Sequence, residues 1–143
     1  MQDVSTIKST ETYSFLDTGS PHHIQFADDL SGLDVKKEGA IIRYSDLYGS
    51  AGSNINFVSQ KGDNVFAVRT YERGVEDETL SCGTGVTAVA LAMHNQGKTN
   101  SNLVQLAVEG GTLEVSFDKQ NQGYENIYLI GAATHVFEGT ITW

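Results

Sequence analysis

The sequence predicts an α+β domain in which mixed or antiparallel strands wrap around one central, buried helix. Short segments rich in β-branched and aromatic residues alternate with many of the 15 glycines, which is typical of strands joined by tight turns. One segment, residues 85–96, instead has apolar residues at helical spacing and on nearly all faces, as a buried helix does. A chain of 143 residues is long enough for one such domain with a core of its own.

The first half of the chain is expected to contain four strands and a short helix. Residues 13–16 and 23–26 are predicted strands on either side of a turn at 18–21, which holds the single proline. A helix is expected within residues 34–44. Residues 54–59 alternate as a half-buried strand would, and residues 65–71 are rich in β-branched and aromatic side chains.

The second half is expected to contain the buried helix and four further strands. Val86, Val89, Ala90 and Met93 follow helical spacing, and Gly97 is a natural stop just after the helix. The later strands are predicted at 103–108, 112–117, 127–130 and 134–137.

Composition excludes several classes of function. A net charge of −9 with no basic cluster argues against nucleic-acid binding. No apolar run approaches the roughly 20 residues that span a bilayer, and residues 1–10 lack a signal-peptide core, so a cytoplasmic protein is expected. A single cysteine excludes an internal disulfide, and one cysteine with four histidines in no spaced Cys/His pattern argues against a zinc site.

The segment from residue 71 to residue 85 is the one that carries candidate chemistry. Cys82 stands just ahead of the buried helix, where unpaired backbone N–H groups and the helix dipole favour an anion and raise a thiol's thiolate fraction. Gly83 and Gly85 leave room for a ligand carboxylate to approach those N–H groups. One helix end is therefore predicted both to activate a thiol and to hold a carboxylate.

Simpler interpretations exist for the same residues. The Cys-Gly-Thr-Gly turn could be a tight strand-to-helix connection with Thr84 as N-cap. Glu72 and Arg73 could be a solvated pair, and His22 a turn histidine bonded to backbone. The three acidic residues 76–78 are expected to form a solvated face without a role.

The whole segment resembles the second cysteine signature of the diaminopimelate epimerase family. The shared string is Glu-Arg-Gly at 72–74, an acidic spacer, Glu-Thr-Leu at 78–80, then Cys-Gly-Thr-Gly at 82–85. Residues 18–22 resemble the family's Gly-Asn-Pro-His turn, residues 54–57 its Asn-containing strand, and residues 133–139 its closing strand. Proline racemases resemble the segment only at Cys-Gly-Thr-Gly, and the phenazine-biosynthesis relatives lack the cysteine.

The resemblance implies a diaminopimelate epimerase-like fold and an isomerase of lysine and peptidoglycan synthesis. Members of this family interconvert LL- and meso-diaminopimelate with neither pyridoxal phosphate nor a metal. Two cysteines on opposite faces of the α-carbon act as acid and base, while helix N-termini stabilise the developing carbanion.

The same resemblance implies a role for each candidate residue. Cys82 would be one acid/base, with Glu72 beside the substrate's ammonium groups and His22 near the reacting centre. The amides of Gly83 and Thr84 would bind the α-carboxylate. The distal carboxylate would be held by Arg73, Asn54 and Ser20, the last of which stands where the family usually has asparagine.

The chain is expected to be the C-terminal half of such an enzyme, inactive alone, because the partner cysteine belongs to an N-terminal half and no second cysteine is present. Met1 is then not the natural start. Residues 1–131 would form the domain, and residues 132–143 a closing strand that returns to the N-terminal half. With that partner absent, strand 134–137 would be an exposed edge and homodimerisation a hypothesis.

Two other functions fit parts of the sequence. The first is a proline or hydroxyproline racemase-like isomerase, whose substrate lacks the distal carboxylate that Arg73 and Asn54 would bind. The second is a carboxylate-binding module of the same fold with an incidental thiol. In that case alkylation of Cys82 would leave ligand binding intact.

Overall fold

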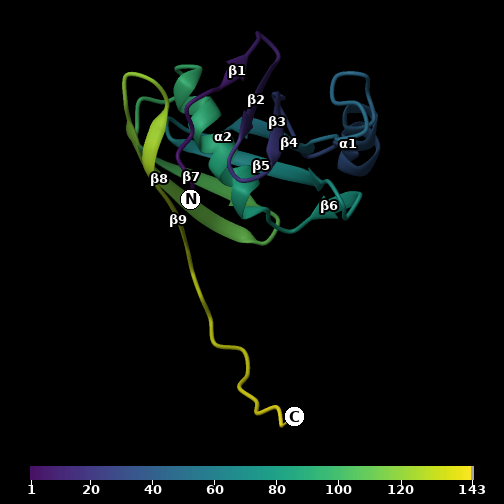
Figure 1. Ribbon diagram of the computed structural model, residues 1–143, viewed down its shortest axis with the longest axis vertical. Helices are drawn as coiled ribbons and strands as arrows, with labels where there is room; N and C mark the ends of the chain where they lie inside the picture. Colours follow the sequence, from purple (N-terminus) through teal and green to yellow (C-terminus); the bar gives the residue numbers. More distant parts are fainter. Residues whose placement is uncertain (143) are drawn as a thin grey trace.

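The computed structural model describes residues 1–142, which form one curled, nine-stranded mixed sheet and two helices. The strand order is β1-β2-β3-β4-β5-β7-β8-β9, with β6 paired to β5 (Figure 1). The strands are β1 (Lys8–Ser9), β2 (Tyr13–Asp17), β3 (Pro21–Phe26), β4 (Asn54–Gln60), β5 (Val65–Glu72), β6 (Asp77–Thr79), β7 (Leu103–Val108), β8 (Gly111–Lys119) and β9 (Tyr124–Gly131); the helices are α1 (Val35–Arg43) and α2 (Gly83–Asn95).

Two parallel strand pairs determine where the helices lie. β3 runs parallel to β4, and β5 runs parallel to β7, whereas the remaining pairs are antiparallel. A parallel pair needs a crossover connection, and here the first crossover contains α1 and the second contains β6 followed by α2. Mixed or antiparallel strands were predicted, and the sheet is mixed.

Residues near the N-terminus close the curled sheet by pairing with its last strand. The amide of Val4 donates to the carbonyl of Tyr124 at 2.9 Å, and the amide of Tyr124 donates back at 2.8 Å. Gly123 allows this approach, since it has a φ of +87° and any side chain there would overlap the backbone of Val4. Neither this bridge nor β1 was predicted from the sequence.

Helix α2 is buried along most of its length and contacts seven strands of the sheet. Every residue from Gly85 to Met93 is buried, so the apolar faces of the helix meet core side chains such as Leu16, Ile24 and Phe66. The helix ends where the sequence predicted, because Gln96 caps it and Gly97 follows with a φ of +69°.

Helix α1 covers the outer face of β4, and this corrects one prediction. Residues 54–59 were expected to form a half-buried strand, yet all six are buried. One face of β4 packs toward α2, while Ile55 and Phe57 join Val35 and Tyr71 in a second apolar cluster beneath α1. Because α1 covers one face and α2 the other, both faces of β4 are buried.

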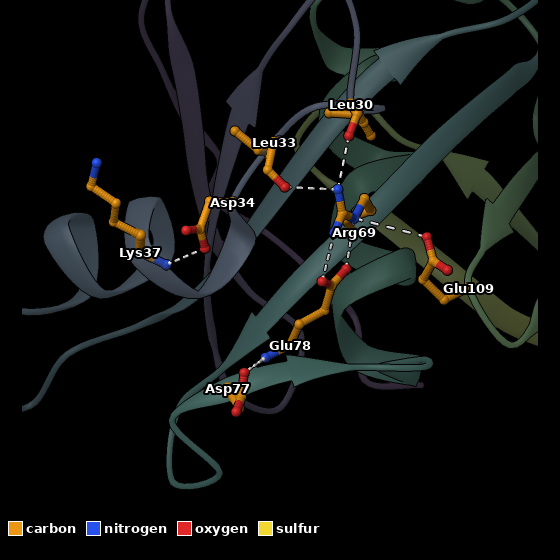
Figure 2. A network of polar contacts seen from close by, with 8 residues as sticks. All are labelled: Leu30, Leu33, Asp34, Lys37, Arg69, Asp77, Glu78 and Glu109. Carbon is orange, nitrogen blue, oxygen red and sulfur yellow. Dashed lines mark hydrogen bonds and ion pairs between the residues drawn. The ribbon is translucent and has the colours of Figure 1, made fainter.

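The prediction that residues 76–78 form a solvated acidic face is wrong for Glu76 and Glu78, which are largely covered, whereas Asp77 is 47% exposed. Glu78 accepts two hydrogen bonds of 2.7 Å from Arg69, which also donates to the carbonyl oxygens of Leu30 and Leu33 (Figure 2). Glu76 accepts from the hydroxyls of Tyr44 and Tyr71 and from the amide of Gly74, and Asp77 pairs with Lys36. These contacts fix the β5–β6 hairpin that leads to Cys82.

Residues 132–142 extend away from the domain and form no strand, in contrast to the strand predicted at 134–137 (Figure 1). All are exposed, and the side chains of Val136 and Phe137 are each 84% accessible. Trp143, the end of the predicted closing segment, lies outside the described residues.

Neither described helix combines the length and the apolar character that crossing a membrane requires.

Candidate active site

Cys82 is the N-cap residue of α2 and is almost completely buried, with 8% of its surface accessible. Its carbonyl accepts the first intrahelical hydrogen bond, from Val86 at 2.9 Å. The amides of Gly83, Thr84 and Gly85 precede that bond, so the helix directs them outward as free donors beside the thiol. Thr84 lies inside the first turn, so it is not the N-cap that the simpler interpretation of this turn assumed.

Thr84 joins the helix end to the turn between β2 and β3. Its carbonyl accepts a 2.8 Å hydrogen bond from the hydroxyl of Thr18. Its own hydroxyl oxygen lies 2.9 Å from His22 Nε2, 3.3 Å from Ser20 Oγ and 3.5 Å from Cys82 Sγ. Four of the sequence-predicted site residues thus meet around one hydroxyl group.

His22 is a fully buried residue of β3 and not a turn histidine bonded to backbone. Its Nδ1 lies 3.0 Å from Asn56 Nδ2, and its Nε2 lies 3.0 Å from Ser20 Oγ. Burial lowers the pKa of His22 from 6.5 to about 4; the negative charge of Asp17 opposes this shift and the positive charge of Arg73 adds to it. The ring is consequently neutral at physiological pH.

Asn54 connects this cluster to Arg73. Its Nδ2 donates to Ser20 Oγ at 3.2 Å and to the carbonyl of Pro21 at 3.1 Å, and its Oδ1 accepts from the backbone amide of Arg73 at 2.8 Å. The Arg73 guanidinium donates to the carbonyl of Ala51 at 3.0 Å. Beyond that bond, the Arg73 side chain lines a cavity of about 540 Å³, together with Tyr13, Phe15 and Tyr48.

Glu72 is the one predicted site residue that does not join the cluster. It is the last residue of β5 and is partly exposed. Among residues 1–142, no hydrogen bond or ion pair links the Glu72 carboxylate to Arg73 or to the residues around Cys82. Glu72 and Arg73 therefore do not form the solvated pair of the simpler interpretation either. Nor do any three His, Cys, Asp or Glu side chains of the described residues group closely enough to hold a metal ion.

Comparison with known proteins identifies the family. The sequence profile of diaminopimelate epimerase matches residues 14–136, which is most of the chain. The chain belongs to the diaminopimelate epimerase family. It is 62% identical to the diaminopimelate epimerase of Flavobacterium psychrophilum over 99% of this chain and 55% of that protein. It is 46% identical to that of Chlorobaculum tepidum over 90% of this chain and 49% of that protein. The chain thus spans about half the length of these curated relatives.

Solved structures show the same fold at much lower sequence identity. A probable proline racemase from Agrobacterium radiobacter K84 has a TM-score of 0.60 and 15% identity, covering 82% of this chain and 41% of that one. A hydroxyproline epimerase from Agrobacterium vitis has a TM-score of 0.57 and 12% identity, covering 78% of this chain and 38% of that one. Identities this low show a shared fold alone.

The diaminopimelate epimerase signature located most of the cluster, but sequence reasoning missed Asn56. Asn56 contacts His22 on one side and packs closely against Gly85 on the other. A signal was present, since Asn54 and Asn56 are two residues apart on a strand and therefore share a face. A pair of amides on one buried face of a strand needs partners, and His22 is one of them.

Proposed function

We propose that this chain is the C-terminal half of a cofactor-independent epimerase that interconverts LL- and meso-diaminopimelate. The observation that carries the proposal is the 62% identity to a diaminopimelate epimerase over 99% of the chain, at about half that protein's length. A buried thiol at the N-terminus of α2, in a cluster of polar side chains, supplies a chemical centre consistent with it.

In the proposed reaction, Cys82 and a second cysteine face opposite sides of the substrate's α-carbon. One thiolate removes the α-proton and becomes a thiol, leaving a carbanion. The other thiol delivers its proton to the opposite face and becomes a thiolate, so the configuration is inverted with no net change in protons. No pyridoxal phosphate or metal takes part. The burial of α2 from Gly85 to Met93 would hold Cys82 rigidly for this transfer.

The carbanion needs stabilisation, for which the first turn of α2 is suited. We assign the α-carboxylate to the amides of Gly83 and Thr84, because free N–H groups at a helix N-terminus bind anions. Arg73, Asn54 and Ser20 would hold the distal carboxylate. Glu72 would lie beside the ammonium groups and His22 near the reacting centre.

The second thiol would come from an N-terminal half, since this chain contains one cysteine. In the complete protein, residues 1–131 would form the C-terminal domain and residues 132–143 would pair with that half as a closing strand. This chain alone is then expected to bind weakly and to turn nothing over. We place the complete enzyme in the cytoplasm, as a step of lysine and peptidoglycan synthesis.

The test is α-proton exchange of LL-diaminopimelate in heavy water, followed by NMR. The protein is expressed with the coding sequence that precedes this segment, and Cys82→Ala is compared with Ser81→Ala, an exposed neighbour in the same turn. Exchange and conversion to the meso form are expected for the unchanged protein and for Ser81→Ala, and should be lost in Cys82→Ala. A folded protein that exchanges no α-proton of diaminopimelate would contradict the proposed substrate, and proline would be the next compound to assay.

A further inference from the structure

We propose that Thr70, Asn56, His22 and Thr84 form a hydrogen-bond relay that directs the Thr84 hydroxyl proton at Cys82 Sγ. The relay runs from β5 through β4 and β3 to the first turn of α2. Its catalytic meaning rests on the proposed function, because it makes His22 and Thr84 serve the Cys82 thiolate. The geometry and chemistry of each step fix the direction in which the protons point.

The first step fixes the orientation of the Asn56 amide. Asn56 lies next to the backbone carbonyl of His23 at 3.1 Å, and a carbonyl oxygen only accepts, so the atom facing it must be the amide nitrogen. The amide oxygen then faces the hydroxyl of Thr70, which donates to it at 3.0 Å. The His23 carbonyl thus sets the orientation of Asn56, and the Thr70 hydroxyl, which can donate or accept, fits that orientation.

The second step fixes the tautomer of His22. With its nitrogen oriented in this way, Asn56 donates its other amide proton to His22 Nδ1 at 3.0 Å. Nδ1 must then carry a lone pair and not a hydrogen. Since the buried ring is neutral, its one proton is on Nε2, which faces Thr84 Oγ1 at 2.9 Å and Ser20 Oγ at 3.0 Å.

The third step sets the direction of the Thr84 hydroxyl. Thr84 Oγ1, the nearer of the two oxygens that face His22 Nε2, accepts the Nε2–H, so the Thr84 hydrogen points away from the ring. Its two possible acceptors are Ser20 Oγ at 3.3 Å, which already accepts from Asn54, and Cys82 Sγ. A thiolate has no hydrogen, so when Cys82 is ionised the hydroxyl is the donor across the 3.5 Å contact to Sγ. A donor aimed at a negative sulfur stabilises the thiolate over the thiol.

Few charged groups lie around the relay to influence the ionisation of the Cys82 thiol. Asp17 at the end of β2 and Arg73 after β5 are the charged groups that act on His22. Asn56 on β4 and Thr70 on β5 are uncharged, and the side chain from β9 that lies against this helix end, Leu129, is apolar. His22 is thus a positioning residue, which acts through Thr84 and exchanges no proton itself.

Alkylation of this chain tests the relay, because its single cysteine is the only thiol that reacts. The rate of reaction with iodoacetamide is measured by mass spectrometry from pH 5 to pH 10. Thr84→Val removes the hydroxyl at nearly constant volume and should move the midpoint of the rate profile upward by about one pH unit. Thr84→Ser restores the donor and should return the midpoint to its original value.

Thr87→Val is the matched control. Thr87 is a buried threonine one turn further along the same helix, and its hydroxyl donates to the carbonyl of Gly83 instead of approaching the thiol. Its midpoint should equal that of the unchanged chain. An equal midpoint in Thr84→Val, or an equal shift in Thr87→Val, would overturn the relay, since either result removes the specific link from Thr84 to Cys82.

A second measurement needs no substitution. The ¹⁵N chemical shifts of His22 at pH 7 should show a neutral ring protonated on Nε2, the state in which Nδ1 accepts from Asn56 and Nε2 donates to Thr84. An Nδ1-protonated ring or an imidazolium would contradict the proposed direction of the relay. Neither readout uses diaminopimelate, so a protein that fails the exchange assay while passing both tests would lose the proposed function and keep the relay.

Discussion

Gly85 of α2 lies so close to Asn56 of β4 that a methyl group added to Gly85 would overlap Asn56 Oδ1 and come within 3.3 Å of Cys82 Sγ. The glycine in the signature after Cys82 therefore has a packing role as well as any role toward a ligand. It lets the helix approach the strand whose amide orients His22.

Gly85→Ala is accordingly expected to destabilise the domain by about 1–3 kcal/mol, because the close contact outweighs the usual gain of up to about 1 kcal/mol for alanine in a helix. Urea unfolding at pH 7 measures the effect. Gly83→Ala is the comparison: its methyl would meet only the Cδ2 atom of Leu129, a 37% exposed side chain that can move aside. Equal stability of the two variants would show that the contact with Asn56 does not control packing here.

Acid should weaken the fold through His22. Its pKa is lowered to about 4 in the folded chain, so between pH 6.5 and pH 4 the unfolded state binds more protons than the folded state. Stability from this group is complete above pH 6.5 and falls as the pH approaches 4, by up to about 3 kcal/mol. His23 and His94, whose pKa values burial also lowers, add losses in the same direction.

Urea unfolding at pH 7 and at pH 4.5 measures this dependence. His22→Gln should lose part of the difference between the two pH values, whereas His135→Gln, in the exposed segment 132–142, should keep all of it. An unchanged pH dependence in His22→Gln would mean that His22 is not held neutral by burial.

The Arg69 network should contribute far more to stability than the Lys36–Asp77 pair (Figure 2). Arg69 binds Glu78 with two hydrogen bonds and donates two more to backbone carbonyls, with its side chain 21% exposed. Lys36 and Asp77 are 66% and 47% exposed. We expect Arg69→Lys to cost about 1–3 kcal/mol, since an ammonium cannot replace the planar fork. Lys36→Ala should cost less than about 1 kcal/mol. The reverse order in urea unfolding would contradict this assignment.

Removal of residues 132–143 should leave the thermal midpoint of this chain within about 2 °C, because residues 132–142 are exposed and unpaired. Differential scanning calorimetry measures the midpoint. A fall of several degrees would show that the segment packs on the domain. Sedimentation of the two forms tests dimerisation through the same segment: a dimer of the longer form alone would support it, and monomers at high concentration would count against it.

The sequence correctly predicted those helices and strands whose positions follow from their own residues. The strand at β7 and the helix at α2 follow from their apolar patterns and from Gly97. It failed where distant partners decide the structure. β1 and β6 are two and three residues long and exist because neighbouring strands supply their hydrogen bonds. The charges of Glu76 and Glu78 gave no hint that Tyr71 and Arg69 would bind them.

The same difference between local sequence and distant partners separates the predicted from the unpredicted features of the candidate site. A contiguous signature predicted Cys82, Gly83 and Thr84 together, and one helix end carries all three. His22 came from the family resemblance, but its neutral state depends on burial that no local pattern reveals. Asn56 was missed since its importance arises from partners on three other elements, namely β3, β5 and α2.

The bridge between Val4 and Tyr124 also constrains the order in which the protein can fold. It joins residues from nearly opposite ends of the domain, and such contacts form slowly because a long loop must close first. During synthesis, the last strands leave the ribosome well after Cys82 does. We therefore expect the thiol to be accessible to modification in the nascent chain and to become protected only when the final strands are in place.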